Sequence, residues 1–350
     1  MMNREQLELM VRRGDMVCGE AFAGVDLTGA DLRGATFERC NFEGVVATNA
    51  NFTEAITQQS VFDHAVLDGA CMDLATMDRC SFARASCVGM GTRGGRFSSC
   101  TFEGANLTEV LLELAVLSNV ELMGAQLLRA RALRTTFEQV RSSQAALTGA
   151  TLDRCAWLAA DLRETVLDAT SFVSCSLLEA NLAGQSLATC DLTGAQLAGA
   201  DLRGVSAKGA AMARCNLGGA QLGDADLERA DLRHAVLHEA SMERVDARAA
   251  KLTAAVLGEA NLVGASFEDA DLSHASLERA VARKARFVRT DLRFADLSHA
   301  DVSESAFVDC LIELTRGHRL VDAEARFTSR HGLLETEPDR AAAEDWTPTY

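Results

Sequence analysis

A five-residue period runs through most of this chain and never changes register. Stepping by five from Phe22 to Ile312 gives 59 positions, and 50 of them hold Leu, Phe, Met, Ile, Val or Trp. The position two residues earlier holds Ala, Cys, Ser, Thr, Val or Gly in 56 of 59 cases. A period of five matches neither the 3.6 residues of a helical turn nor the two-residue alternation of a strand. It indicates a repeat architecture, in which each short unit packs mainly against its neighbours.

The repeating unit reads small, polar, large apolar, and then two mostly polar residues. Clean copies stand at residues 30–34, 200–204 and 225–229. This pattern resembles the pentapeptide-repeat family, whose motif is A(D/N)LXX, and the resemblance extends over residues 20–312. It implies an all-β solenoid, namely a right-handed quadrilateral β-helix with four pentapeptides in each coil.

A square coil of four pentapeptides places residues 20 apart above one another. The large residue would then point inward, while the small residue lets the corner close and the polar residues face water. Phenylalanines recur at this spacing, which predicts aromatic stacks inside the solenoid. The predicted core residues are Phe22, Phe42, Phe62, Phe82, Phe102, Leu202, Leu227, Phe267, Phe287 and Phe307. Coils paired at about 4.8 Å would make a rod roughly 70 Å long.

Residues 1–20 precede the repeat and are expected to form an N-terminal cap. A helix over residues 3–13 is indicated by Asn3 as its N-cap, with Gln6 as the partner in a capping box. Gly14 can end this helix. Such a cap would cover the backbone and the apolar core that a solenoid exposes at its first coil.

Residues 21–312 are the expected repeat domain, and residues 313–350 the expected C-terminal cap and flexible acidic tail. A second capping helix is expected over residues 318–333, because three apolar residues share one helical face. These residues are Leu320, Ala323 and Phe327.

Two stretches fit the repeat poorly. Residues 86–96 are rich in glycine, and residues 131–146 have Ala132 and Ser142 at central positions. Both could be bulged coils, which often lie beside functional surfaces. The alternative is that small central residues merely thin the coil. Trp157 is too large for most coil interiors, so a local distortion is expected there.

The sequence contains no P-loop, dinucleotide fingerprint, nucleophile elbow or HExxH motif. It therefore predicts no enzyme activity, no catalytic residue and no cofactor. Eight of the eleven cysteines occupy the small position of the repeat, where Cys substitutes for Ala. His234 and His238 form too weak a pair to predict a metal site.

No apolar run approaches 18 residues, so a membrane span is not expected. The N-terminus is charged and lacks the apolar segment of a signal peptide. These features predict a cytoplasmic protein.

We expect a non-catalytic scaffold for a protein partner, whose identity the sequence does not give. Residues 2–7 and 13–15 resemble pentapeptide-repeat regions associated with bacterial type VI secretion, which implies an adaptor for secretion or assembly. The candidate interaction surface is acidic and follows the slot before the large residue. It comprises Asp201, Asp226, Asp231, Asp271, Asp291 and Asp296.

The alternative function is DNA mimicry, by which some family members inhibit or protect gyrase or another topoisomerase. The net charge of −16 has the required sign. However, residues 21–312 carry 38 acidic and 26 basic residues, a net charge of −12. Duplex DNA about 70 Å long carries roughly 40 negative charges. The charge and the few aromatic residues argue against direct nucleic-acid binding. Two oligomeric states stay open, a monomer and a homodimer.

Overall fold

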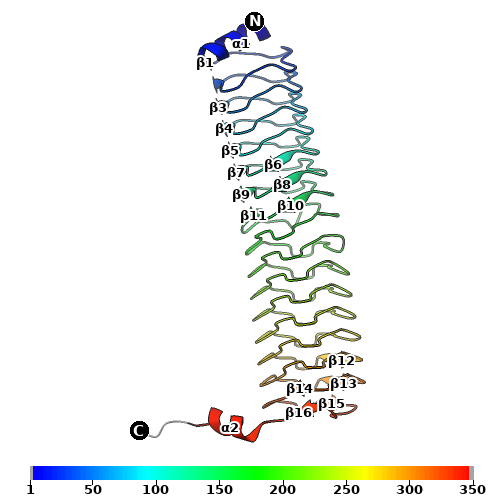
Figure 1. Ribbon diagram of the computed structural model, residues 1–350. Helices are drawn as coiled ribbons and strands as arrows, with labels where there is room; N and C mark the ends of the chain where they lie inside the picture. The colour runs from blue at the N-terminus through cyan, green and yellow to red at the C-terminus, as the bar shows by residue number, and fades with distance from the viewer. Residues whose placement is uncertain (1–2, 347–350) are drawn as a thin grey trace. The chain divides into compact units, whose positions relative to one another are not determined.

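The computed structural model describes residues 3–346, and the chain divides into two compact units, Met1–Ala180 and Asn181–Tyr350. Each unit is a right-handed quadrilateral β-helix of parallel coils, as the backbone trace in Figure 1 shows. Residues 20 apart pair with each other, for example Ala21 with Asn41 in the first unit and Asn181 with Asp201 in the second. The predicted fold class is therefore confirmed.

The first unit carries short strands on two of its faces. One face holds an eight-stranded parallel sheet, and another holds a three-stranded sheet, while isolated bridges join the remaining faces. The eight strands in order are β1 (Met16–Cys18), β2 (Thr36–Glu38), β3 (Ile56–Gln58), β4 (Thr76–Asp78), β5 (Arg96–Ser98), β7 (Val116–Ser118), β9 (Thr136–Glu138) and β11 (Ala156–Trp157). The other three are β6 (Leu111–Glu113), β8 (Arg131–Leu133) and β10 (Thr151–Asp153).

The second unit is joined mostly by isolated bridges, and its strands lie near its C-terminal end. One sheet contains β12 (Arg286–Val288), β13 (Ala306–Val308) and β15 (Arg326–Phe327). A second sheet pairs β14 (Thr315–Arg316) with β16 (Leu333–Leu334). Helix α2 (Pro338–Glu344) follows.

The capping helix expected over residues 318–333 is wrong, because this stretch continues the coil. Phe327 pairs with Phe307 in the ladder, and their rings stack at 4.4 Å. A side chain that extends an aromatic column gains more than it would on the face of an isolated helix. The helix of this region is α2, which begins five residues later.

Helix α1 (Arg4–Arg13) forms where the sequence predicted it. The side chain of Asn3 accepts a hydrogen bond from the Gln6 amide at 2.9 Å, and the Gln6 side chain accepts one from the Asn3 amide at 3.0 Å. Leu7 is buried, and the Arg4 guanidinium donates to the carbonyl of Thr28 at 2.7 Å. These contacts fasten the helix to the first coil.

The core positions lie where the period places them. All ten predicted core side chains are at most 3% exposed. Neighbouring rings in the column from Phe22 to Phe102 stack with centroids 4.6–4.9 Å apart. The glycine-rich stretch 86–96 is a regular part of this unit, since Ser86 pairs with Asn106 and Gly91 with Leu111. The bulge considered there is therefore absent.

Candidate groove in the first unit

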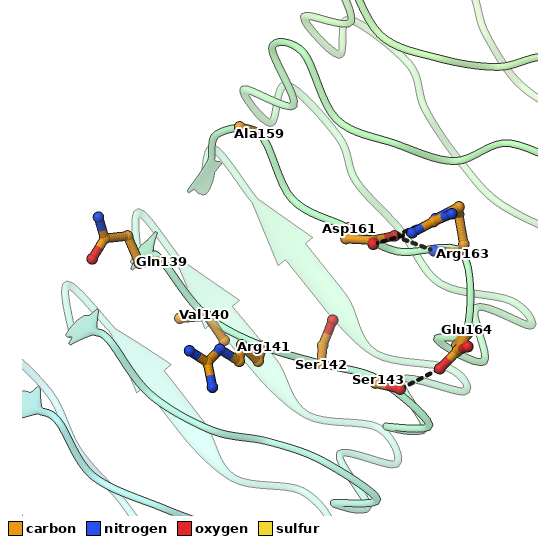
Figure 2. Close-up of a pocket in the computed structure, with 9 residues that line it drawn as sticks. All are labelled: Gln139, Val140, Arg141, Ser142, Ser143, Ala159, Asp161, Arg163 and Glu164. Carbon is orange, nitrogen blue, oxygen red and sulfur yellow. Dashed lines mark hydrogen bonds and ion pairs between the residues drawn. The ribbon is translucent and has the colours of Figure 1, made fainter.

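A groove of about 450 Å³ opens on the first unit, between two consecutive coils. Its lower wall is the chain from Gln139 to Ser143, and its upper wall includes Ala159, Asp161, Arg163 and Glu164. Figure 2 shows these two segments, with the Ser142 side chain between them and a hydrogen bond from Ser143 to Glu164 joining them at one end. The groove lies at the end of the stretch 131–146 and follows Trp157.

The groove exists because the backbone ladder is interrupted there. One coil earlier the pairing is regular, since the Leu122 amide donates to the Arg141 carbonyl at 2.7 Å and the Arg141 amide donates to the Val120 carbonyl at 3.0 Å. The corresponding bonds of the next coil would run from Ser142 to Asp161 and from Asp161 to Val140. Within residues 3–346, neither of these two bonds is formed.

The sheet ends early on the neighbouring face as well. Strand β11 has two residues where its partner β9 has three, so pairing stops after Trp157 and Phe137. The bond expected from the Gln139 amide to the Leu158 carbonyl is likewise missing from the described part of the chain. The interruption therefore spans a corner of the coil.

Beyond the groove the two coils meet again, but shifted by one residue. The Gln144 amide donates to the Glu164 carbonyl at 3.2 Å, whereas the repeat would pair it with residue 163. The hydroxyl of Thr165 donates to the Ser142 carbonyl at 3.0 Å, and Ser143 donates to the Glu164 carboxylate. These side-chain bonds hold the shifted register, and regular pairing resumes between Leu147 and Val166 at 2.8 Å.

Trp157 supplies the reason for the irregularity. Its indole is buried, with 2% exposure, and stacks on Phe137 with centroids 4.6 Å apart. A bicyclic ring needs more room than the Leu or Phe that usually fills this position, so the chain that follows it moves away from the coil below. Its buried indole N–H has no hydrogen-bond partner among the described residues. The distortion expected at Trp157 thus lies just after it.

Charged residues flank the groove in balanced numbers. Arg163 binds both carboxylate oxygens of Asp161, at 2.9 and 2.6 Å, and this hydrogen bonding lowers the pKa of Asp161. Arg141 reaches out of the groove to Glu121 in the coil below, at 2.9 Å. With Glu164 on the upper wall, two basic and two acidic residues line the groove, so it carries no strong field of either sign.

The six aspartates predicted as an interaction surface do not share one surface. They occupy four different columns of bridged residues, and only Asp231, Asp271 and Asp291 fall in the same column. Four of the six form ion pairs with arginines of the same chain. Arg203 binds Asp201, Arg233 binds Asp231 and Arg293 binds Asp291, each at 2.6 Å. Arg316 lies 3.6 Å from Asp296.

A histidine cluster around the buried His318 was not anticipated from the sequence. His299, His318 and Glu344 bring three potential metal ligands together, and Nε2 of His318 lies 3.1 Å from the Glu344 carboxylate. However, Nδ1 of His318 accepts the Glu337 amide at 3.2 Å, which places the ring proton on Nε2. A metal-bound imidazole needs the opposite arrangement, with its second nitrogen donating. The cluster therefore fits an anchor for α2 better than a metal centre.

A second group of potential ligands, His238, Glu239 and Glu259, lies fully on the surface. Nε2 of His238 is 3.4 Å from the Glu239 carboxylate. Exposed side chains of this kind are not held in place for a metal, and no sequence motif marks them.

The sequence model for pentapeptide repeats matches this chain over most of its length. The matched residues are 21–56, 48–84, 96–131, 175–212, 215–253, 250–287 and 270–311. The chain belongs to the pentapeptide-repeat family. The groove lies between two matched segments, in the interval from residue 131 to residue 175.

Several solved pentapeptide-repeat structures are similar in fold. Full-length QnrB1, a plasmid-mediated fluoroquinolone resistance protein, is 18% identical over 56% of this chain and 88% of its own, with a TM-score of 0.37. HetL from the cyanobacterium Nostoc, involved in heterocyst differentiation regulation, is 22% identical over 90% and 97%, with a TM-score of 0.18. Rfr23 from the cyanobacterium Cyanothece is 19% identical over 45% and 90%, with a TM-score of 0.24. A search of curated proteins gave no match.

Proposed function

We propose that this pentapeptide-repeat protein is a non-catalytic scaffold that binds a protein partner through the groove at residues 139–164. The observation that carries this proposal is the interrupted ladder between Ser142 and Asp161. Regular coils bond their backbone groups to one another, whereas this coil leaves such groups to a partner. The carboxylate of Asp161, which lines the groove, is already bound by Arg163 at 2.6 Å.

Site-specific crosslinking tests the location of the binding site. A photoreactive amino acid at Gln139 should capture a protein in the source cell, because Gln139 lines the groove and is exposed. Gln59 is the matched control, since it is also exposed and occupies the same position of the same face in a regular coil. Equal capture from both positions, or none from either, would contradict the groove as the site.

The finer role of an adaptor for secretion or assembly rests on the N-terminal residues 2–7 and 13–15. In the structure, Arg4–Arg13 of this region form helix α1, and the resemblance of its sequence to secretion-associated regions is what supports the role. Recovery of secretion-spike or effector proteins in the crosslinks from Gln139 would support a role of the scaffold in bacterial secretion.

The DNA-mimic role at gyrase is the alternative, and the net charge of −16 is the observation in its favour. Against it, four of the six aspartates of the predicted surface are ion-paired with arginines. A DNA mimic needs dense and uncompensated negative charge, as on a duplex. We therefore rank the scaffold first.

A cytoplasmic location and the absence of direct membrane contact are part of this proposal. Among residues 3–346, no helix has the length and apolarity to cross a bilayer.

A further inference from the structure

We infer that the groove binds an extended peptide segment of the partner by strand addition. This inference rests on the proposed function, because it names the chemistry by which the same groove recognises its partner. Three features of the groove carry it: the unpaired backbone groups on both walls, the balance of charge, and the devices that keep the walls apart.

Backbone groups on both walls of the groove lack the partners that they have in regular coils. In every regular coil the amide at the position of Ser142 donates along the solenoid axis, as Leu122 does to Arg141 at 2.7 Å. At the groove, the amides of Gln139 and Ser142 and the carbonyl of Val140 lack these partners within the described chain. They form an alternating row of donors and acceptors on the lower wall.

The upper wall offers the complementary row. The amide and the carbonyl of Asp161 both lack the bonds to the coil below that their counterparts in regular coils make. The Leu158 carbonyl lacks its usual donor, Gln139, as well. A peptide backbone carries alternating donors and acceptors of this kind, which is the chemistry of strand addition.

The charge of the groove favours a peptide over a nucleic acid. The lining residues carry two positive and two negative charges. The groove therefore attracts the phosphates of a nucleic acid only weakly. Arg141 is the exception at the rim. Its side chain is 74% exposed, and among residues 3–346 it bonds to Glu121 through Nη1 alone. We therefore assign the partner segment an acidic residue at the end that lies over Arg141.

The groove is built to stay open without an occupant. The buried Trp157 prevents the upper coil from settling onto the lower one, and the one-residue shift is locked by the bonds from Thr165 to Ser142 and from Ser143 to Glu164. A preorganised site avoids the cost of opening at the moment of binding. Replacing Trp157 with a smaller residue should thus let the groove close.

The test begins with a random library of linear eight-residue peptides displayed on phage and selected against the full chain. Trp157→Leu restores the residue usual at this position and should weaken the selected peptides at least about tenfold, because the coils then pair with each other. Phe97→Leu is the matched control, since Phe97 is buried in the same column of a regular coil. It should leave binding unchanged.

Backbone methylation of the selected peptides separates strand addition from side-chain docking. A single N-methyl group at a central residue should weaken binding about tenfold by removing one donor. In the unmodified protein, peptide should also slow amide exchange at Gln139, Ser142 and Asp161, which does not depend on the folding of any variant. Arg141→Ala should weaken only the peptides that carry an acidic residue.

The outcomes distinguish the two proposals. Selected peptides that bind equally well when N-methylated, or to Trp157→Leu, would overturn strand addition, as would a failure to select any peptide. If Gln139 still crosslinks a partner in that case, the groove is the binding site but recognises a folded surface. If Gln139 captures nothing either, both proposals fail.

Discussion

At the residue scale, the surface charge is organised by aspartates that bind the arginine two positions later. Asp31 and Arg33 illustrate the geometry, with Nε and Nη2 of the arginine both 2.8 Å from the carboxylate oxygens. Asp231 with Arg233 and Asp246 with Arg248 repeat it. In these copies of the repeat, the aspartate stands just before the large residue and the arginine just after it, so the pair spans one core position on the outer face. The spacing was visible in the sequence, but its consequence for the expected acidic surface was missed.

These pairs predict a loss of stability at low pH. Hydrogen bonding from Arg33 lowers the pKa of Asp31 from 3.8 to about 2, and the pKa values of Asp231 and Asp246 are lowered by the same cause. Because the folded pKa is the lower one, the pairs stabilise the fold above about pH 4 and lose that contribution as the pH falls toward 2. The carboxylates are half-buried and their arginine partners are exposed, so each pair contributes only a few tenths of a kcal/mol.

The measurement is the urea midpoint between pH 2 and pH 6, for the natural chain and for Arg33→Gln, Arg233→Gln and Arg248→Gln combined. The combined variant should show a smaller decline over this range. An identical decline in both proteins would mean that these pairs do not couple to folding.

The inward positions predict a severe effect of charge. Leu202 is fully buried in the second unit, with Leu182 and Leu222 in the coils on either side. Leu202→Asp would place an unpaired carboxylate in this column and should cost about 3–5 kcal/mol. Leu202→Met is the control and should cost less than about 1.5 kcal/mol. An unchanged urea midpoint and circular dichroism spectrum for Leu202→Asp would refute the inward assignment.

At the element scale, a helix or strand could be predicted from the sequence when the residues that determine it lie close together in the chain. Helix α1 could be predicted because its capping box and its terminal Gly14 are all within the helix or beside it. Helix α2 could not, since a seven-residue helix is unstable alone and this one is held by the His318 side chain from the coil. The aromatic columns follow from a spacing of 20 residues. The one-residue shift at Gln144 does not, because it depends on how the chain relaxes around Trp157.

The attachment of α2 predicts that a single carboxylate controls it. The carboxylate of Glu344 lies 3.1 Å from His318, 3.3 Å from Arg319 and 3.0 Å from Arg340. Hydrogen bonding from His318 lowers the pKa of Glu344 to about 2. Glu344→Gln should detach the helix, seen as faster amide exchange over residues 338–344 with the exchange of β13 unchanged. Since the folded pKa is the lower one, the natural helix should stay attached at pH 5 and detach as the pH falls toward 2.

Glu335→Gln is the matched control for this variant, because Glu335 is an exposed carboxylate of the same segment for which no ion pair is found within residues 3–346. If Glu335→Gln and Glu344→Gln accelerate exchange equally, the effect belongs to the charge of the segment and not to the anchor.

At the scale of the whole molecule, the net negative charge raises the question whether this chain could bind the basic DNA site of another protein. The net charge of −16 will slow association with any nucleic acid. It does not by itself imitate a duplex, whose phosphates carry no bound cationic side chains. In this chain, arginines lie beside aspartates in both units. A basic partner protein would therefore contact positive and negative side chains in alternation.

This argument predicts little effect on gyrase. At equal molar amounts, the purified protein should change the supercoiling rate of a bacterial gyrase by less than about twofold, because the arginines already neutralise the aspartates locally. Replacing Arg33, Arg203, Arg233 and Arg293 with Gln removes four positive charges and changes the net charge from −16 to −20. That variant should inhibit more than the natural chain, since it leaves four aspartates without their bound cations. Strong inhibition by the natural chain would instead favour the DNA-mimic alternative over the scaffold, and equal, weak effects of both proteins would show that the arrangement of charge does not matter to the enzyme.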